Sequence, residues 1–349
     1  MNALLHHKKR KSEGWLLAAF SLLAVVLFVA DILSGSVLIP LEEVAGALFR
    51  PSMAGETVNT IVRDFRLPKA ITALMAGMAL SVSGLQMQTV FRNPLAGPYV
   101  LGISAGASLA VALFALGFSS FLAVGFSFAG SWSLATIAWA GAFAVMLLIL
   151  FVSSRVNDNM TVLILGILFS SAAGAVVSIL QYFSSESMLK AFIVWTMGSL
   201  GSITSEQLTV VVPAVIAGIL LALSRMKDLN AFLLGENYAR SLGVPILRSR
   251  LWIFLSASLL AGTITAFCGP IGFIGIAVPH LARVIFRTTD HRILLPAVIL
   301  LGANAMLLSD IIAQLPGFQA TLPINSVTAL LGIPIVIWMI IRNRKFAAL

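Results

Sequence analysis

Residues 90–110 read VFRNPLAGPYVLGISAGASLA, and they interrupt a sequence that is apolar for long stretches on both sides. Arg92, Asn93 and Pro94 form the polar break, and Gly102, Ser104 and Gly106 begin the next apolar run. A proline disfavours helical geometry in the residue before it, and an asparagine side chain can bond free backbone groups in a turn. The stretch therefore predicts a turn between two apolar helices, the second of which can pack closely on its neighbours.

The composition of the chain indicates that these apolar helices lie in a membrane. The 349 residues are 59% hydrophobic and 10% charged, and the mean hydropathy is +1.03. Soluble domains carry about 25% charged residues. Only helices and closed barrels span a bilayer, and a barrel would show short segments of alternating apolar and polar residues. Because the apolar runs are long and continuous, we expect an all-α polytopic membrane protein.

Ten segments are long or apolar enough to be membrane spans, since about twenty apolar residues cross a bilayer. The eighth is short and contains Gly272, Gly275 and Pro279, which predicts a tilted or partly re-entrant helix. Residues 184–205 are too short to cross twice and too apolar for a plain loop, so a short interfacial or re-entrant helix is expected there. The predicted spans are 14–33, 66–90, 98–118, 131–152, 161–183, 206–224, 250–268, 272–287, 292–312 and 325–341.

The distribution of charge predicts the topology. An even number of spans places both termini on one side, and assigning that side to the cytoplasm puts most of the 22 Lys and Arg residues there. The chain is then one transmembrane domain, 1–349, with a cytoplasmic basic tail over 1–13, an outer segment over 34–65 and a cytoplasmic loop over 225–249. The net charge of +9 is explained by this bias and does not indicate nucleic-acid binding.

Sequence patterns of catalysis and metal binding are absent. The chain has no Gly-x-x-x-x-Gly-Lys-Ser/Thr or His-Glu-x-x-His pattern and no Cys/His cluster with metal-ligand spacing. We therefore expect no catalytic residue and no metal site, and we interpret His280 and His291 as interfacial anchors. Asp31 and Asp310 fall near the outer ends of spans, where water is expected to reach them. Ion coupling therefore has little support, and energy is expected to come from another subunit.

The loop segment 234–245, LGENYARSLGVP, is predicted to form a short helix over 233–242 that Gly243 and Pro245 end. Glu236 and Arg240 are four residues apart on one face of it, in the favourable order. Periodicity alone leaves two interpretations equally open. One is a solvated helix with an exposed ion pair, and the other is a helix that docks onto a cytoplasmic partner.

An ordered series of motifs over about residues 60–342 resembles a known family, the permease subunits of ABC importers for iron chelates, haem and vitamin B12. The motifs are Arg66-Leu67-Pro68-Lys69, Ser83-Gly84 with Gln88, Arg92-Asn93-Pro94-Leu95-Ala96, Leu101 to Ala107, Trp195 to Gly201, Leu234-Gly235-Glu236 with Ala239-Arg240 and Leu242-Gly243, Cys268 to Gly275, Pro279 to Arg283, Asp290-His291-Arg292 with Leu295-Pro296, and Leu322-Pro323 through Thr328-Ala329.

The resemblance implies a ten-span bundle like that of the vitamin B12 importer permease, in the inner membrane of a bacterium. It implies a homodimer around a central pathway, two cytoplasmic ATPase subunits that bind ATP and Mg, and a periplasmic substrate-binding protein; the chain itself would bind no cofactor. The expected cargo is an iron–siderophore or haem, with cobalamin as the alternative. A secondary transporter or channel that works without ATP is the rival class.

The resemblance also implies roles for particular residues. Arg66 and Lys69, where the family usually has Arg, would be an outward basic pair that meets the binding protein, and Arg63 would join them from one helical turn before. Asn93 and Leu95 would form a cytoplasmic gate. The pathway would be lined by Ser170, Ser171, Gly174 and Ser178, whose small size suits close helix packing equally well. The segment that the ATPases grip would comprise Leu234, Gly235, Glu236, Ala239, Arg240, Leu242 and Gly243, with Gly243 separating two short helices where no side chain fits.

Overall fold

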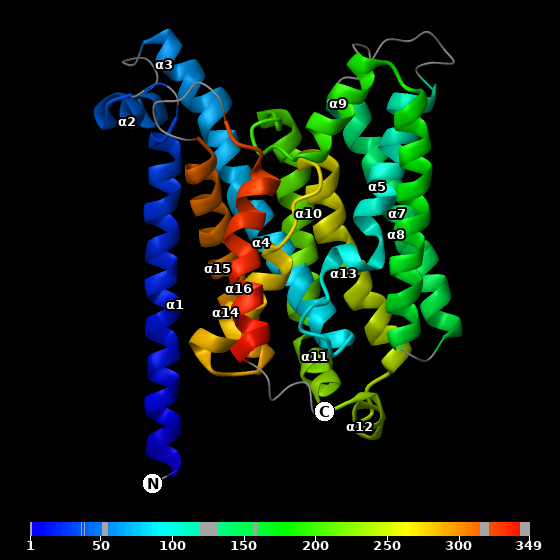
Figure 1. Cartoon of the computed structure of the whole chain (residues 1–349). Coiled ribbons are helices and arrows are strands. Elements are labelled where there is room, and N and C mark those ends of the chain that lie inside the picture. Colours follow the sequence, from blue (N-terminus) through cyan, green and yellow to red (C-terminus); the bar gives the residue numbers. More distant parts are fainter. Residues whose placement is uncertain are drawn as a thin grey trace.

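A computed structural model of the chain describes residues 2–35, 37, 39–50, 55–118, 131–156, 159–314 and 321–342, and within these ranges every regular element is a helix (Figure 1). The predicted all-α class is confirmed. The basic tail predicted over 1–13 is continuous with the first helix from Asn2 onward, but the side chains of residues 1–12 lie outside what the structure describes.

Ten apolar helices occupy the ten predicted positions. By length and composition, seven of the described helices suffice to cross a membrane, and three shorter apolar helices accompany them. Each long span follows from an uninterrupted apolar run, because in lipid every backbone group must be bonded within the helix. The long helices are α1 (Asn2–Leu33), α4 (Leu67–Val90), α7 (Ser131–Arg155), α8 (Asn159–Phe183), α10 (Ser205–Ser224), α13 (Ile246–Cys268) and α15 (His291–Gln314). The three shorter apolar helices correspond to α5 (Ile103–Ala112), α14 (Ile274–Phe286) and α16 (Ile324–Arg342).

One end of the bundle carries short helices that extend the spans. The segment predicted as an outer loop over 34–65 contains α2 (Leu41–Phe49) and α3 (Glu56–Thr60). A π-helical stretch, Ile61–Arg66, joins α3 to α4, so helical structure is continuous from Glu56 to Val90 and begins before the span predicted over 66–90. The short helix expected within 184–205 is α9 (Glu186–Thr196), and it lies at the same end (Figure 1).

The opposite end carries two short helices together with the N-terminus of α1 (Figure 1). They are α11 (Met226–Leu233) and α12 (Glu236–Ser241), and we call them the α11–α12 pair. The predicted helix over 233–242 is thus shorter, because Leu234 and Gly235 form a turn. Gly235 has φ +99° and ψ 154°, a conformation that only glycine adopts readily, so it and not Gly243 separates the two helices.

The centre of the bundle is α4, which packs against α10, α13, α14 and α15. Glycines allow these approaches: a Cβ on Gly84 would overlap the carbonyl of Gly275 in α14, and one on Gly77 would overlap that of Gly302 in α15. The close approach predicted after residue 102 also occurs, since a Cβ on Gly106 would lie 2.7 Å from the Gly141 carbonyl oxygen of α7. Backbone contact through small residues is the usual basis of helix association in lipid.

The periphery of the bundle is formed by α1 and α8, which leave most of their apolar surface uncovered within the chain. Only 17% of the span in α1 and 22% of that in α8 is buried, against 78% for the continuous helix that contains α4. Apolar side chains at such positions are suited to lipid or to another membrane subunit.

Candidate functional site

The α11–α12 pair projects beyond the spans and presents apolar side chains at its surface. Leu234, Tyr238 and Leu242 are 61%, 55% and 59% exposed, and Arg240 and Gly243 are exposed beside them. Ala239 points the other way and is wholly buried. Gly243 has φ +81°, and nothing lies within 4 Å of a Cβ built on it. The expectation that no side chain fits there was wrong. The space around Gly243 is open, and it is the positive φ of its backbone that favours glycine.

An ion pair anchors α12 to the bundle. Glu236 accepts a hydrogen bond from Arg250 of α13, whose side chain is 4% exposed and also donates to Ser153 Oγ of α7 at 3.2 Å. Helical spacing pairs Glu236 with Arg240, but the partner in the structure is Arg250, which follows fourteen residues later on another helix and is not indicated by any local pattern. The helix that carries the exposed apolar residues is therefore held by a buried cation.

A second polar connection joins α11 to α15 and α4. Asn230 of α11 donates to Asp290 Oδ1 at 2.7 Å and accepts from the backbone N–H of His291 at 2.9 Å. The His291 ring lies 2.7 Å from Asn230 Oδ1 through Nδ1 and 2.9 Å from Thr89 Oγ1 through Nε2. Burial raises the pKa of the Asp290 carboxyl, but the Arg292 backbone N–H, the Asn230 amide and the charge of Arg292 outweigh it and hold the pKa below its ordinary value.

The histidines predicted as interfacial anchors are both buried. His280 is 8% exposed and its ring packs edge-on against Trp338 of α16 at 6.4 Å between centroids, while His291 is 1% exposed. That interpretation was wrong, because the sequence does not reveal that α14 and the start of α15 pack inside the bundle.

The turn between α4 and α5, residues 91–97, has the local structure that its sequence predicts. Asn93 Oδ1 accepts from the Leu95 N–H at 2.9 Å, and the Asn93 N–H donates to the Gln88 carbonyl at 3.2 Å. Leu95 is 41% exposed. The turn lies beside the α11–α12 pair, because a Cβ built on Gly235 would lie 3.6 Å from Arg92 Nη1.

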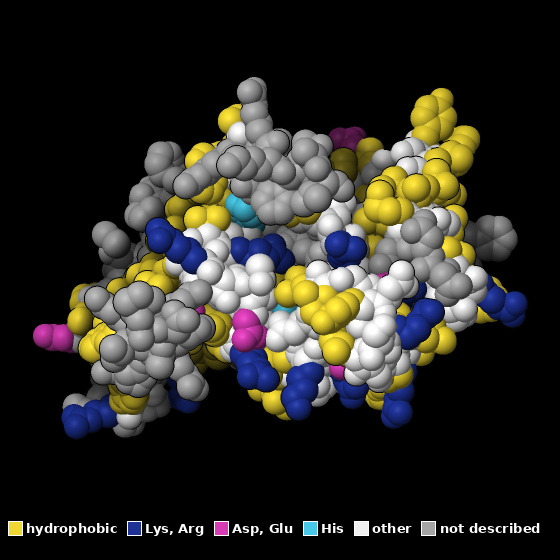
Figure 2. Space-filling model, turned by 90° about the horizontal axis from the view of Figure 1, so that it is seen from below, with side chains coloured by type: hydrophobic (Ala, Val, Ile, Leu, Met, Phe, Trp, Pro, Cys, Tyr) yellow, Lys and Arg dark blue, Asp and Glu magenta, His cyan; other side chains and the backbone are white. Residues whose placement is uncertain are grey.

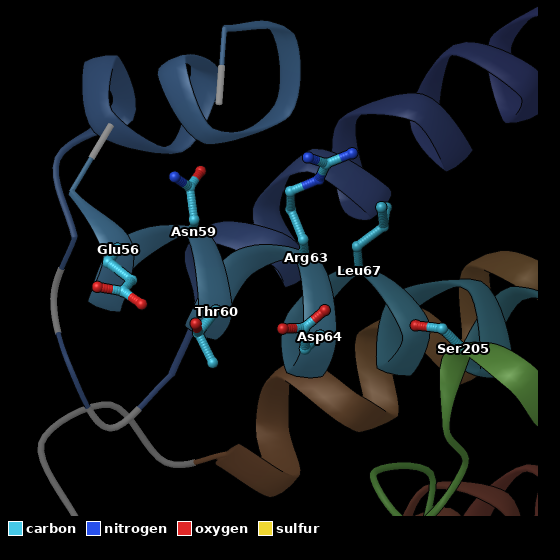
Figure 3. A pocket seen from close by; sticks show the side chains of 7 residues that line it. All are labelled: Glu56, Asn59, Thr60, Arg63, Asp64, Leu67 and Ser205. Atoms are coloured by element: carbon cyan, nitrogen blue, oxygen red, sulfur yellow. The ribbon is translucent and has the colours of Figure 1, made fainter. Parts of the chain in front are cut away.

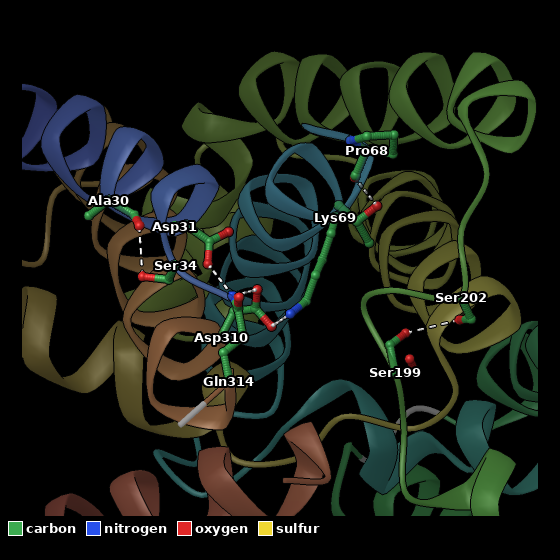
Figure 4. A network of polar contacts seen from close by, with 10 residues as sticks. Ala30, Asp31, Ser34, Pro68, Lys69, Ser199, Ser202, Asp310 and Gln314 are labelled. Atoms are coloured by element: carbon green, nitrogen blue, oxygen red, sulfur yellow. Dashed lines mark hydrogen bonds and ion pairs between the residues drawn. The ribbon is translucent and has the colours of Figure 1, made fainter. Parts of the chain in front are cut away.

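The basic residues expected to face outward at the other end are mostly engaged within the chain. Arg66 is 9% exposed and donates to the carbonyls of Ile32 and Leu33 at 3.0 and 3.1 Å, where it closes the C-terminal end of α1. Lys69 forms an ion pair with Asp310 at 3.1 Å (Figure 4). Arg63 remains exposed.

The two aspartates expected in contact with water are buried. Asp31 is 3% and Asp310 is 2% exposed. The side-chain amide of Gln314 donates to both, at 2.9 and 3.0 Å, and Figure 4 shows the three side chains and Lys69 converging between α1, α4 and α15. The expectation was wrong because segments more than two hundred residues apart cover these carboxyls.

Arg63 contributes to a hollow at the outer surface of this end. Its volume is about 550 Å³, and Figure 3 shows Glu56, Thr60 and Asp64 on successive turns of one helix beside it, with Arg63 next to Asp64. The lining residues are Glu56, Asn59, Thr60, Arg63, Asp64, Leu67 and Ser205. The surface is polar and carries both signs of charge.

The predicted pathway residues lie on α8. Ser171, Gly174 and Ser178 are exposed, and nothing lies within 4 Å of a Cβ built on Gly174. Ser170 is half-buried, where it lies beside Gly102. The three serine hydroxyls donate to carbonyls four residues earlier in α8. Within the part of the chain that the structure describes, these small residues thus leave a face of α8 open, and only Ser170 lies against another segment.

In the described part of the chain, ten apolar helices form a bundle with the buried α4 at its centre, and a pair of short helices projects beyond them; this is the architecture of a polytopic membrane protein. Among the described residues no group of three or more His, Cys, Asp or Glu side chains is placed to hold a metal ion.

The sequence model of the FecCD transport family matches residues 22–342, and the chain belongs to this family. It is 33% identical to the vitamin B12 import system permease protein BtuC of Klebsiella pneumoniae over 347 residues, which cover 99% of this chain and 98% of that protein. It is 38% identical to the hemin transport system permease protein HmuU of Yersinia pestis over 286 residues, 81% and 83% of the two chains. The structure of a metal-chelate type ABC transporter in an inward-facing conformation matches with a TM-score of 0.80 at 29% identity, over 94% of this chain and 99% of that one.

Proposed function

We propose that the chain is the permease subunit of an ATP-driven importer that carries a metal chelate, an iron–siderophore or haem, from a periplasmic binding protein into the cytoplasm. The observation that carries this proposal is the α11–α12 pair. Its exposed Leu234, Tyr238 and Leu242 lie on the segment that projects from the end of the bundle, and the Glu236–Arg250 ion pair anchors this segment. Exposed apolar residues on a rigid support are typical of a protein docking surface.

The partner at this surface would be a pair of cytoplasmic ATPase subunits that bind ATP and Mg. Leu234, Tyr238 and Leu242 would insert into a groove of the ATPase, with Arg240 at the rim. Gly235 and Gly243 would set the angle of α12, and Ala239 and Glu236 would hold it to the bundle. This end would face the cytoplasm, together with both termini, in a bacterial inner membrane. Figure 2 supports this orientation, since Lys and Arg side chains are spread over the lower face and Asp or Glu are few.

The periplasmic binding protein would dock at the opposite end. The exposed Arg63 and the hollow around it offer a charged surface that would orient the encounter. Arg66 and Lys69 would act behind this surface, where they hold α1 and α15 against α4.

Two copies of the chain would enclose the pathway. The open face of α8 with Ser171, Gly174 and Ser178 would line it, with Ser170 at its margin, and Asn93 and Leu95 of each copy would close it at the cytoplasmic end. The support for this arrangement is the poor burial of α8 within one chain and the exposure of Leu95.

The cargo is proposed on the relatives alone. A haem-transport permease and a metal-chelate transporter favour an iron chelate, whereas the vitamin B12 permeases make cobalamin the alternative. The binding protein would set the choice.

Reconstitution in proteoliposomes tests the proposal. The chain is co-expressed with the ATPase and binding protein encoded beside it, and uptake of haem, a ferric siderophore and cobalamin is measured with and without ATP. We expect ATPase co-purification and ATP-dependent uptake of one of the iron chelates. Uptake of cobalamin alone would select the alternative cargo, and uptake without ATP or ATPase would overturn the proposal in favour of a secondary transporter or channel.

A further inference from the structure

The α11–α12 pair and the α4–α5 turn are adjacent but belong to different parts of the chain, and two polar connections link the pair to the bundle. The Glu236–Arg250 connection leads to α13 and on to Ser153 of α7. The Asn230–His291–Thr89 connection leads instead to α4, and Thr89 is the residue before Val90, where α4 ends and the turn begins.

The proton positions in this second connection follow from its donors and acceptors. The backbone N–H of His291 can only donate, so the Asn230 atom that receives it is the amide oxygen, and the amide nitrogen faces Asp290. Because that oxygen can only accept, His291 Nδ1 carries a hydrogen and donates to it. In a neutral imidazole Nε2 is an acceptor, so the single hydrogen of the Thr89 hydroxyl points to His291 rather than to the Leu85 carbonyl, which also lies within hydrogen-bond distance at 2.8 Å. The donated hydrogens of these side chains therefore all point the same way, from Thr89 to His291, from His291 to Asn230 and from Asn230 to Asp290.

Burial strengthens this series of hydrogen bonds. His291 is 1% exposed and Thr89 is 1% exposed, so water does not compete for their hydrogen bonds. The end of α4 is held on its other side as well, because Arg283 of α14 donates to Gln88 Oε1 at 2.5 Å and Gln88 Nε2 donates to the Ile276 carbonyl at 3.1 Å. The backbone carbonyl of the same Gln88 receives the N–H of Asn93 in the turn.

We propose that Asn230, His291 and Thr89 are positioning residues that transmit movement of the α11–α12 pair to the α4–α5 turn. When the ATPase displaces α11, Asn230 pulls on the His291 ring, and the ring shifts the last turn of α4 through the Thr89 hydroxyl. The turn that carries Asn93 and Leu95 then moves with it. This inference rests on the proposed ATP-driven function, and it adds the route by which ATP hydrolysis reaches the gate.

The test compares two buried threonines of α4. The hydroxyls of Thr89 and Thr72 each lie within hydrogen-bond distance of the carbonyl four residues earlier, at 2.8 and 2.7 Å, but only Thr89 also contacts His291. The chain is purified with its ATPase in nanodiscs, and an environment-sensitive fluorophore is placed on Leu95→Cys or on Asn237→Cys, an exposed position of α12. The signal recorded is the fluorescence change on trapping with ATP and vanadate.

We expect Thr89→Val to reduce the change at position 95 about fivefold or more, the effect of one lost hydrogen bond on an equilibrium, while the change at position 237 persists. Thr72→Val and Thr89→Ser should keep both changes, because the first spares the connection and the second restores the hydroxyl. Asn230→Ala should match Thr89→Val, and the double variant should lose no more than either single one, since both interrupt the same chain of contacts.

The inference and the proposed function fail in different ways. A Thr89→Val response equal to that of the unmodified chain at both positions would overturn the inference alone, as would additive losses in the double variant. Loss at both positions in Thr89→Val, with Thr72→Val intact, would mean that Thr89 supports the fold and does not transmit movement. Failure of the unmodified chain to bind an ATPase or respond to ATP would overturn the proposed function, and the inference with it.

Discussion

At the scale of single residues, the feature that most changes the functional interpretation is the pairing of Lys69 with Asp310. The sequence places a lysine beside Arg66 in a segment that resembles a docking motif, and the structure turns its ammonium toward two buried carboxyls. Buried charges persist only when they are paired and hydrogen-bonded, which Lys69 and Gln314 achieve together. The docking hypothesis therefore depends on Arg63, the basic residue of this segment that stays exposed.

Replacing Lys69 with Ala should destabilise the chain by about 2 kcal/mol, because it leaves Asp310 without its cation; the figure lies below that for a fully buried pair since Lys69 is 21% exposed. Thermal unfolding in detergent measures the effect. Arg63→Ala, at an exposed position, is the control and should change stability by less than about 0.5 kcal/mol. Adding Asp310→Asn to Lys69→Ala should recover stability, and a double variant less stable than the single one would contradict the ion-pair account.

At the scale of elements, helix contacts in this protein are set by where glycine meets backbone. Gly84 of α4 faces the Gly275 carbonyl so closely that a methyl group has no room, whereas Gly174 of α8 faces open space. Both occur in apolar runs that look alike in the sequence. The first holds the central helix in place, and the second leaves a surface for a partner subunit or the pathway.

Gly84→Ala should lower stability by about 1–3 kcal/mol or prevent assembly, because the added methyl must push α4 and α14 apart. Gly174→Ala adds the same methyl group to the same kind of helix and should leave the monomer's unfolding temperature unchanged. Size-exclusion profiles and unfolding temperatures in detergent report both variants. Equal behaviour of the two would show that the contact between Gly84 and Gly275 is not tight.

Two glycines beside α12 matter for their backbone conformation, whereas the glycines of α4 matter because a side chain would have no room. Gly235 has a backbone conformation nearly exclusive to glycine, and Gly243 has a left-handed one that other residues adopt at a cost of about 1 kcal/mol. Gly235→Ala should therefore reorient α12 and weaken ATPase binding more than Gly243→Ala does. Dissociation constants for the purified ATPase measure the difference, and stronger impairment by Gly243→Ala would contradict this ranking.

At the scale of the whole molecule, the two ends of the bundle differ in structure. The α2, α3 and α9 helices occupy one end, and the α11–α12 pair with the N-terminus of α1 occupies the other (Figure 1). If the second end is cytoplasmic, the basic residues, the proposed docking surface and the proposed gate all lie on the side where ATP is available.

Thiol labelling of intact cells tests this orientation. A membrane-impermeant maleimide should label Glu56→Cys, exposed on α3, and should not label Asn237→Cys on α12 until the membrane is permeabilised. The single native cysteine, Cys268, is buried and gives little background. Labelling of Asn237→Cys in intact cells would place the α11–α12 pair outside and remove the basis for ATPase docking.

Much of the fold could be read from composition and pattern. Apolar runs of about twenty residues must be helices in lipid, so the ten positions, the α-helical class and the short α9 followed from the sequence. The Asn93 turn also followed, because its hydrogen bonds join neighbours in the chain. The α11–α12 pair followed only in part: one helix was predicted over 233–242, whereas the structure has α12 over Glu236–Ser241 and a separate α11 before it.

What only the tertiary structure decided were the partners of polar residues that are distant in the chain. Four contacts join segments whose proximity no local pattern encodes. They are the contacts of Arg66 with the carbonyls of α1, of Lys69 with Asp310, of Glu236 with Arg250, and of His291 with Asn230 and Thr89. In a membrane the physical reason is general. Hydrophobicity specifies that a helix crosses the bilayer, but it is nearly indifferent to which helix lies beside it, so close glycine contacts and buried hydrogen bonds decide the arrangement. By itself the sequence determined that this chain is a bundle of membrane-spanning helices; the packing decided which of its charges are paired within the chain and which stay exposed.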